Sequence, residues 1–411
     1  MTSIKPIKID KQVVWQSYLK VKTNGGAAGV DDMSIEDFQA SLKGNLYKLW
    51  NRMSSGSYFP PPVKRVEIPK VSGGVRALGI PTVGDRIAQM VVKQHLEPLL
   101  EPVFDPDSYG YRPGKSAIEA VAATRERCWQ SDWVVEFDIK GAFDHIDHRL
   151  LMKALRYHKV PIWIELYISR WLTAPSVSPD GTKIDRTCGI PQGGVISPLL
   201  MNLFMHYAFD RWMRRTFPTC AFARYADDAV VHCRSKRQAE LVYRSIEDRL
   251  KTCFLTVHPE KSAIVYCKDS NRRGQHAQRQ FTFLGFTFRA RSAVNRNGTR
   301  FTSFLPAVSN EALKRMRGVI RAWRLVRKTP ATLKEFSEKY NRTLRGWWQY
   351  YGTFYPTQLY RLGNYLDLRL AYWARRKFKR LAGHPKRSRE WLRRIRIAQP
   401  WLFVHWENSG G

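Results

Sequence analysis

The chain has 411 residues and carries 69 Lys and Arg residues against 35 Asp and Glu residues, a formal net charge of +34. This excess is atypical of a soluble metabolic enzyme and indicates a polyanionic partner, most simply a nucleic acid. The hydrophobic content of 44% and the aromatic content of 13% are sufficient for packed cores, which excludes a disordered basic tail. The chain contains no run of about 18 apolar residues, so we predict no transmembrane helix.

Strand and helix patterns alternate through the chain before residue 300. Residues 65–80 predict a hairpin centred on Ser72-Gly73-Gly74. Residues 133–139 predict a buried strand, and residues 221–233 predict two short strands joined by a tight turn. Helices are predicted at residues 117–128, 199–214 and 238–252. The fold class indicated is α+β with an antiparallel sheet.

The C-terminal region is the most basic part of the chain, with 24 Lys and Arg residues against 5 Asp and Glu residues in residues 311–400. A boundary is expected between residues 292 and 310, where Asn295, Asn297, Gly298 and Pro306 predict loops. The spacing of apolar residues after it predicts three helices. Their inner faces are, in turn, Ala312, Met316, Val319, Trp323 and Val326; Leu333, Phe336, Tyr340, Leu344, Trp347 and Tyr351; and Leu359, Leu362, Leu366, Leu370, Trp373 and Leu381.

Basic residues occupy the opposite faces of these helices, which suits contact with a phosphate backbone. A solvated basic surface is the alternative, but three such faces with few acids favour nucleic acid. Trp347, Trp348, Tyr350 and Tyr351 are candidates for stacking on bases. Helical spacing predicts that some of them are core residues, in the first place Trp347 and Tyr351.

Three carboxylates are placed at strand ends. Asp138 closes an apolar strand, and Asp227 and Asp228 are adjacent in the tight turn of residues 225–228. Adjacent acids repel each other unless a cation lies between them, and carboxylate oxygens are ligands that Mg²⁺ prefers. The alternative is an ordinary polar turn, because Asp is common in turns.

The segments around these acids resemble the sequence blocks of reverse transcriptases, in particular those encoded by group II introns. The blocks are FDIKGAFD at 137–144, GIPQGGVISPL at 189–199, RYADD at 224–228, HPEKS at 258–262 and FLGF at 283–286. Residues 24–31 (NGGAAGVD) resemble the N-terminal extension of intron-encoded enzymes, and residues 341–351 (NRTLRGWWQYY) resemble the core of their maturase, or thumb, domain.

The resemblance implies a right-hand polymerase with fingers, a palm built on an antiparallel sheet, and an all-α thumb. The expected domains are an N-terminal extension with a template-lid loop at 1–45, fingers and palm at 46–300, and the thumb or maturase domain with a short basic C-terminal segment at 301–411. It implies RNA-directed DNA synthesis with two Mg²⁺ ions, for which Mn²⁺ is a possible substitute. Asp138, Asp227 and Asp228 would be the catalytic metal ligands, with the main-chain carbonyl of Ile139 as a further ligand.

Six further residues are candidates for nucleotide binding. Lys70 and Arg76 lie symmetrically about Gly73, so we expect them to face each other in the hairpin and to clamp a triphosphate. Their alternative is a solvated hairpin. The other four candidates are Phe143, as a steric gate against a ribose 2′-hydroxyl; Gln192, in contact with the nucleotide or the minor groove; Lys261, beside pyrophosphate; and Arg112, beside a phosphate. For these the alternatives are a core phenylalanine, a loop amide, a solvated lysine and turn chemistry.

The expected partners are group II intron RNA, an RNA template with its DNA primer, dNTPs and target DNA, with no membrane. The six cysteines form no C-x-x-C pair, which fits free thiols in a reducing compartment. We expect a bacterial cytoplasmic protein that is associated with the nucleoid through nucleic acid. The chain ends at Gly411 soon after the thumb, which resembles the compact class without an endonuclease. Two alternatives are an intron-independent reverse transcriptase used in defence or DNA repair, and an RNA-binding maturase whose polymerase activity is dispensable.

Overall fold

The computed structural model describes residues 7–69 and 75–407, and the chain forms two compact units. The first comprises the described residues of Met1–Ser116 together with Phe137–Val231 and Glu240–Ser262. The second comprises Ala117–Glu136, His232–Ala239 and the described residues of Ala263–Gly411. Each unit is therefore assembled from segments that are distant in the sequence. The division at residues 45 and 300 expected from the sequence differs from this grouping and stays a prediction.

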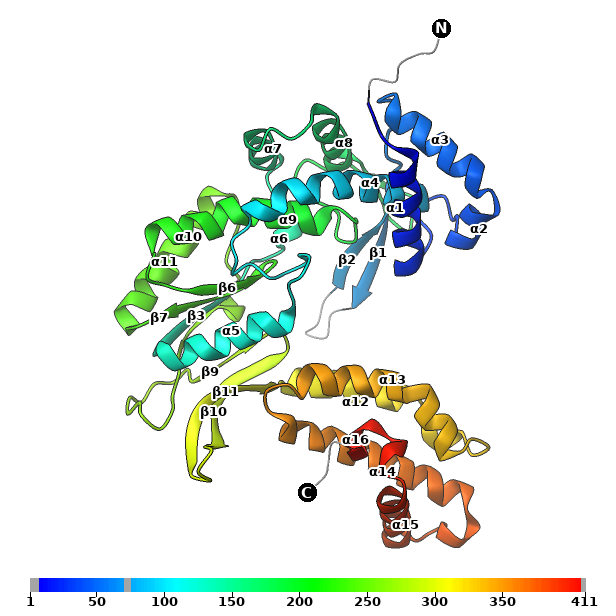
Figure 1. Ribbon diagram of the computed structural model, residues 1–411, viewed down its shortest axis with the longest axis vertical. Helices are drawn as coiled ribbons and strands as arrows, with labels where there is room; N and C mark the ends of the chain where they lie inside the picture. Colours follow the sequence, from blue (N-terminus) through cyan, green and yellow to red (C-terminus); the bar gives the residue numbers. More distant parts are fainter. Residues whose placement is uncertain (1–6, 70–74, 408–411) are drawn as a thin grey trace. The chain divides into compact units, whose positions relative to one another are not determined.

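Helices predominate in the first unit (Figure 1). They are α1 (Lys11–Asn24), α2 (Ile35–Ala40), α3 (Leu42–Ser54), α4 (Val83–Leu100), η1 (Glu101–Val103), α6 (Ala142–His145), α7 (His148–Tyr157), α8 (Ile162–Thr173), α9 (Ser197–Met205), the π-helical turn η2 (His206–Asp210), α10 (Arg211–Thr216) and η3 (Pro259–Lys261). Helix α11 (Lys236–Thr252) begins in the second unit and continues in the first. The helix predicted over residues 199–214 is thus confirmed, but a π-helical turn interrupts it.

The strands form three sheets. The first has the order β2-β1-β4-β5 and contains β1 (Val63–Pro69), β2 (Val75–Ile80), β4 (Ser176–Val177) and β5 (Lys183–Ile184). The second has the order β6-β7-β3-β8 and contains β3 (Trp133–Asp138), β6 (Phe222–Tyr225), β7 (Asp228–Cys233) and β8 (Ala263–Tyr266). The third has the order β11-β10-β9 and contains β9 (Gln280–Phe283), β10 (Phe286–Val294) and β11 (Arg300–Val308). Antiparallel pairs occur in all three, so the predicted α+β class is confirmed.

Strand β3 is an inner strand of the second sheet, and its sequence explains its place. Val134, Val135 and Phe137 are fully buried although neighbouring residues of a strand point to opposite faces. A strand covered on both faces needs a continuous apolar run instead of an alternating one, because each face meets other parts of the core. In β3 the apolar residues are interrupted by the half-buried Glu136, and Asp138 at the end of the strand is partly exposed.

The C-terminal part of the second unit is helical after β11. It contains α12 (Asn310–Ala322), η4 (Leu325–Arg327), α13 (Leu333–Tyr351), η5 (Pro356–Leu359), α14 (Tyr360–Lys377), η6 (Lys379–Leu381), α15 (Pro385–Ala398), η7 (Pro400–Leu402) and α16 (Val404–Glu407). Helix α5 (Ala117–Gln130) belongs to the same unit. The start of α13 is set by a capping box, in which Thr332 and Glu335 bond each other's backbone N–H groups.

Three details of this region correct the sequence prediction. Helix α12 stops at Ala322, because Arg324 adopts a left-handed conformation with φ of 51°, so Val326 lies in a separate turn. Val319 is 39% exposed, and Ile320 fills the inner face in its place. Pro306, expected in a loop, lies in β11 opposite Phe288. Strand β11 is an edge strand, where a missing N–H is tolerated.

The aromatic residues of α13 are also distributed differently from the prediction. Trp348 and Tyr351 are each 7% exposed and belong to the core, whereas Trp347 is only half-buried. Trp347 stacks on Trp323, and Trp323 stacks on Tyr340 with ring centroids 4.1 Å apart. All six cysteines are free. Within the described residues, no helix has the length and apolar character needed to cross a membrane.

Candidate active site

The turn that carries two of the predicted catalytic residues joins β6 to β7. Tyr225 pairs with Asp228, so only Ala226 and Asp227 lie in the loop of the hairpin. Ala226 has φ of 58°, a conformation that a residue with a Cβ atom adopts at a cost in energy. Asp227 and Asp228 are both half-buried. Such a backbone persists only where the surroundings hold it in place.

The buried guanidinium of Arg224 is hydrogen-bonded to this turn. Its Nε and Nη2 atoms donate to the two carboxylate oxygens of Asp210, each at 2.6 Å, and both side chains are fully buried. Its Nη1 atom donates to the carbonyl of Ala226 at 2.9 Å. The remaining N–H groups bond the side chains of Asn202 (3.1 Å) and Ser108 (2.7 Å), so all five donors of the guanidinium are used.

Asp210 reaches Arg224 from the end of the π-helical turn His206–Asp210. A π-helical turn inserts one residue into a helix and so changes the direction in which the following side chains point. Burial raises the pKa of the Asp210 carboxyl, and the charge of Arg224 opposes that rise. The pair is a buried ion pair with complete hydrogen bonding, the arrangement in which such a pair is tolerated.

Gly110 closes the other side of the turn. A Cβ atom at this position would lie 2.5 Å from the main-chain nitrogen of Ala226, so only glycine allows the two backbones to approach so closely. The carbonyl of Gly110 accepts a hydrogen bond of 2.6 Å from Asn202, which also bonds Arg224. The turn between β6 and β7 is therefore held by one connected polar network.

Asp138 lies at the end of β3, the strand next to β7 in the sheet. Its main-chain N–H donates to Ser262 Oγ at 3.3 Å, and its carbonyl accepts from the N–H of His258 at 2.8 Å. Its carboxylate forms an ion pair of 2.6 Å with the ammonium of Lys261. Ile139 and Val257 form an isolated antiparallel bridge. Its hydrogen bonds are made by the residues on either side of Ile139, so they do not use the carbonyl of Ile139 itself.

The residue types at this site are suitable ligands for Mg²⁺, but their side chains are not placed as in a formed metal site. Carboxylate and carbonyl oxygens from two neighbouring strands are the donor types that Mg²⁺ takes. Within the described residues, however, no three Asp, Glu, His or Cys side chains surround a common point as metal ligands. The carboxylate of Asp138 forms an ion pair with the ammonium of Lys261.

Phe143 and Gln192 come from two segments that pack directly on each other. The carbonyl of Phe143 accepts from the N–H of Ile190 at 2.7 Å, and Gln192 Nε2 donates to Asp144 Oδ2 at 3.1 Å. Phe143 is half-buried. The structure thus brings together two candidate residues that are 49 positions apart in the sequence.

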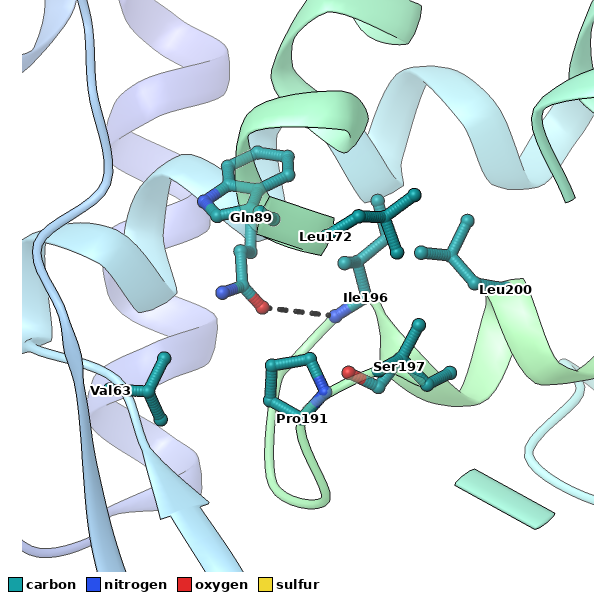
Figure 2. Close-up of a pocket in the computed structure, with 9 residues that line it drawn as sticks. Val63, Gln89, Leu172, Pro191, Ile196, Ser197 and Leu200 are labelled. Atoms are coloured by element: carbon teal, nitrogen blue, oxygen red, sulfur yellow. Dashed lines mark hydrogen bonds between the residues drawn. The ribbon is translucent and has the colours of Figure 1, made fainter. Parts of the chain in front are cut away.

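The loop that carries Gln192 rests on a small, mostly apolar pocket, shown in Figure 2. Gln89 of α4 accepts a hydrogen bond of 3.4 Å from the N–H of Ile196, at the start of α9 (Figure 2). The buried carboxylate of Asp85 in turn receives hydrogen bonds from Gln89, Tyr58 and Trp171. Gly193 has φ of 119°, and a Cβ atom there would lie 2.6 Å from the carbonyl oxygen of Gly79. The loop that carries Gln192 is therefore held by α4, through Gln89, and by β2, through Gly79.

Part of the predicted clamp of Lys70 and Arg76 lies outside the described residues. Lys70 and the side chain of Arg76 lie outside the described part of the chain. The backbone register of β1 and β2 pairs Arg76 with Ile68 and Val75 with Pro69. A hairpin in which Arg76 is directly opposite Lys70 is therefore wrong, because that pairing requires a register shifted by two residues.

Arg112 was expected to contact a phosphate, and in the structure its guanidinium is bonded to the protein. Its side chain is 6% exposed and forms an ion pair of 2.7 Å with Glu101. Its Nη1 atom also donates to the carbonyls of Asp105 and Ser108, both at 2.6 Å. Its Nε atom is bonded to Glu101 as well. Arg112 thus stabilises the segment before Gly110, and its contact with a phosphate stays a prediction.

The N-terminal glycine-rich loop is attached to the start of α4. Arg86 donates to the carbonyls of Gly25 (3.1 Å) and Ala27 (2.8 Å). A Cβ atom at Gly29 would lie 2.7 Å from the backbone of Thr82. The loop predicted as a template lid is thus held against α4, although its action on a template stays a prediction.

Comparison with known proteins identifies the family of this chain. The model of the family described as "Reverse transcriptase (RNA-dependent DNA polymerase)" matches residues 68–288, more than half of the chain. The chain belongs to the reverse transcriptase family. A second model, "Group II intron, maturase-specific domain", matches residues 313–392, the helical part of the second unit.

Several curated relatives are similar to this reverse transcriptase. Protein YkfC of Escherichia coli (strain K12) is 33% identical over 294 residues, which cover 62% of this chain and 74% of that protein. Group II intron-encoded protein LtrA of Lactococcus lactis subsp. cremoris is 33% identical over 198 residues, 47% of this chain and 32% of LtrA. The putative COX1/OXI3 intron 2 protein of Saccharomyces cerevisiae is 26% identical over 282 residues, 68% of this chain and 31% of that protein. The matched part is thus about a third of the length of the two intron proteins.

Sequence reasoning missed the residues that hold this reverse transcriptase's catalytic turn. Arg224 was visible only as the first residue of the RYADD block, and Asp210 and Asn202 were undistinguished members of a predicted helix. One signal was available: a charged Asp210 among the apolar residues of 199–213 needs a partner if it is buried. Which arginine supplies that partner is decided by tertiary packing.

We expect replacement of Arg224 to separate stability from activity. Arg224→Met leaves Asp210 as a buried, unpaired carboxylate and should lower the free energy of unfolding by about 3–5 kcal/mol. The double variant Arg224→Met/Asp210→Leu removes both charges and should regain most of that loss. Both variants lack the bond to the Ala226 carbonyl, so both should show lower kcat in primer extension. Urea unfolding and steady-state kinetics measure the two effects.

The control is Arg170→Met, which loses two hydrogen bonds to the carbonyls of Gly56 and Tyr58 and none to the catalytic turn. It should keep its kcat. Wild-type kcat in the folded double variant would show that Arg224 does not position the turn.

Proposed function

We propose that this chain extends a DNA primer along an RNA template, as an RNA-directed DNA polymerase. The observation that carries the proposal is the position of Asp138 at the end of β3 and of Asp227 and Asp228 at the start of the neighbouring strand β7. Membership in the reverse transcriptase family supports it. The buried network around Arg224 supports it as well, because a strained turn with such support is typical of a functional site.

We propose Asp138, Asp227 and Asp228 as ligands of two Mg²⁺ ions, with the Ile139 carbonyl as a further ligand and Mn²⁺ as a substitute. Bound ions of this kind lower the pKa of a primer 3′-hydroxyl and stabilise the charge of departing pyrophosphate. Lys261 Nζ is bonded to Oδ2 of Asp138, and the second oxygen of this carboxylate would be available to a metal ion. The ammonium of Lys261 would lie beside the phosphates of the nucleotide.

The nucleotide is proposed to bind between the loop of Gln192 and the segment of Phe143. The half-buried ring of Phe143 would exclude a ribose 2′-hydroxyl, and Gln192 would position the base or sugar. Lys70 and Arg76 are proposed to bind the triphosphate, each from its own place on the hairpin and not as a symmetric pair. A contact of Arg112 with a phosphate stays a prediction.

A second function is proposed for the helical part of the second unit. The match of residues 313–392 to the maturase-specific domain supports binding of group II intron RNA to assist splicing and retrohoming. The 24 Lys and Arg residues against 5 Asp and Glu residues in 311–400 supply the charge that a folded RNA requires. Use of the polymerase in defence or DNA repair, away from any intron, is the competing proposal.

Asp227→Ala should abolish polymerase activity without unfolding the protein. The loss of a charged group that acts in the transition state should lower the rate of primer extension on an RNA template with Mg²⁺ by on the order of 10³-fold. The matched control is Asp248→Ala, in which the replaced aspartate lies on α11 and its side chain is 81% exposed. Equal extension by the two variants would contradict the polymerase assignment.

Phe143→Ala should relax the choice of sugar. Removal of the ring opens space beside the nucleotide, so the ratio of kcat/KM for dNTP to kcat/KM for rNTP should fall at least about tenfold. The activity with dNTPs serves as the internal control for folding. An unchanged ratio in an active variant would mean that Phe143 does not select the sugar.

Splicing should be separable from synthesis. Because RNA binding depends on the basic helices and not on Asp227, the Asp227→Ala variant should still promote splicing of the group II intron RNA that the wild type assists. The readout is the fraction of spliced RNA at a fixed protein concentration. Loss of splicing in this variant, with RNA affinity retained, would tie the two activities to one mechanism.

A further inference from the structure

A groove lies between α14 and α15 in the second unit, with a volume of about 390 Å³. Asn364 and Asp367 of α14 line one wall, and Arg389, Arg393 and Arg396 of α15 line the other. The two helices contact each other, so the groove is formed within one unit and does not depend on the placement of any other part.

The three arginines share one face of α15. Their spacing of four and three residues places them on consecutive turns of the same side of the helix, toward α14. The side chain of Arg393 is 70% exposed and that of Arg396 is 32% exposed, so guanidinium groups are present both at the rim and deeper in the groove. Leu392, which is 4% exposed, lies between them and fixes this face of α15 to the core.

The single carboxylate of the groove is already engaged by the protein. One oxygen of Asp367 accepts hydrogen bonds of 2.8 Å from both His405 and Trp406, and its other oxygen lies 3.8 Å from Arg396. Asp367 therefore attaches the C-terminal helix α16 to α14 and does not neutralise the outer arginines. Glu390 lies 3.7 Å from Arg393 at the exposed surface, where an ion pair contributes little. The groove is electropositive.

We propose that this groove binds a phosphodiester of a single nucleic-acid strand, in the first place of the RNA on which the protein acts. Guanidinium groups match phosphate oxygens with paired hydrogen bonds, and three of them converge here. A volume of about 390 Å³ is of the scale of one nucleotide. The proposal rests on the proposed function, since it assigns a specific contact for the RNA that the second unit is proposed to bind.

Two double variants of the full chain test the proposal. Both lose two positive charges, and in both the substitutions lie on α15. Arg389→Gln/Arg393→Gln removes two guanidinium groups from the groove. Arg387→Gln/Arg394→Gln removes two from the opposite face of α15, and neither of these residues lines the groove. Arg393 and Arg394 each lie 3.7 Å from Glu390, so each variant loses one contact with that glutamate. Far-UV circular dichroism and thermal unfolding check that both remain folded.

We would measure the affinity for a single-stranded RNA and for DNA of the same sequence, each as a function of salt concentration. Both probes are about 30 nucleotides long, which is about eight times the 4-nucleotide lower limit of a protein site. The groove variant should bind RNA about tenfold more weakly than the control, and the slope of log K against log salt should decrease by about 0.7 for one lost phosphate contact. An equal loss for DNA supports recognition of the phosphodiester alone. A loss confined to RNA supports an additional contact with the ribose.

Equal weakening in both variants would overturn the proposal, because general charge would then account for it. Normal RNA affinity with a loss of binding to poly-glutamate would also overturn it, since the occupant would then be an acidic peptide. Primer extension and RNA binding by the wild type test the proposed function itself. If the wild type extends primers and binds RNA while the groove variant matches it, the groove assignment alone fails.

Discussion

The guanidinium of Arg224 is fully buried, and its five N–H groups bond Asp210, Asn202, Ser108 and the carbonyl of Ala226. A charge in such a place is tolerated only while every donor has a partner, since an unpaired buried charge costs several kcal/mol. The bond to Ala226 therefore cannot relax independently of the others. The left-handed conformation of that residue, and with it the position of Asp227, depends on the whole network.

Arginine serves two purposes in this protein. Arg224, Arg112 and Arg86 point into the first unit and bond main-chain carbonyls of the segments around the site. The arginines of α15 lie instead on the surface of the second unit, where water and ligands reach them. The net charge of +34 already subtracts Asp210 and Glu101, so the ion pairs of Arg224 and Arg112 leave that excess unchanged.

The candidate nucleotide site depends on close backbone approaches more than on side-chain packing. Gly110 approaches Ala226, and Gly193 approaches Gly79, at distances that no Cβ atom permits. These glycines thus explain how loops far apart in the chain come together. Asp138 and the turn at Pro259–Lys261 are brought together in part by the hydrogen bond from the N–H of His258 to the Asp138 carbonyl.

Much of the secondary structure and the main carboxylates could be predicted from the sequence. Residues 133–139 predicted a strand because a run of β-branched and aromatic residues suits a strand buried on both faces. Residues 221–233 predicted the hairpin that carries Asp227 and Asp228 for a similar reason. These features depend on neighbours in the chain, so local pattern was sufficient. The wrong choice of Trp347 over Trp348 is the limit of such reasoning, because a shift of one residue moves a side chain about 100° around a helix.

By itself, the sequence determined the α+β class, the family blocks, the three aspartates and the basic character of residues 311–400. Only the tertiary structure decided that Arg112 is engaged by Glu101, that Asp210 supports the catalytic turn through Arg224, and that three arginines of α15 line a groove. The physical reason is the same in each case. The role of a charged side chain depends on which oppositely charged or polar groups surround it, and those groups come from segments whose proximity is created by folding.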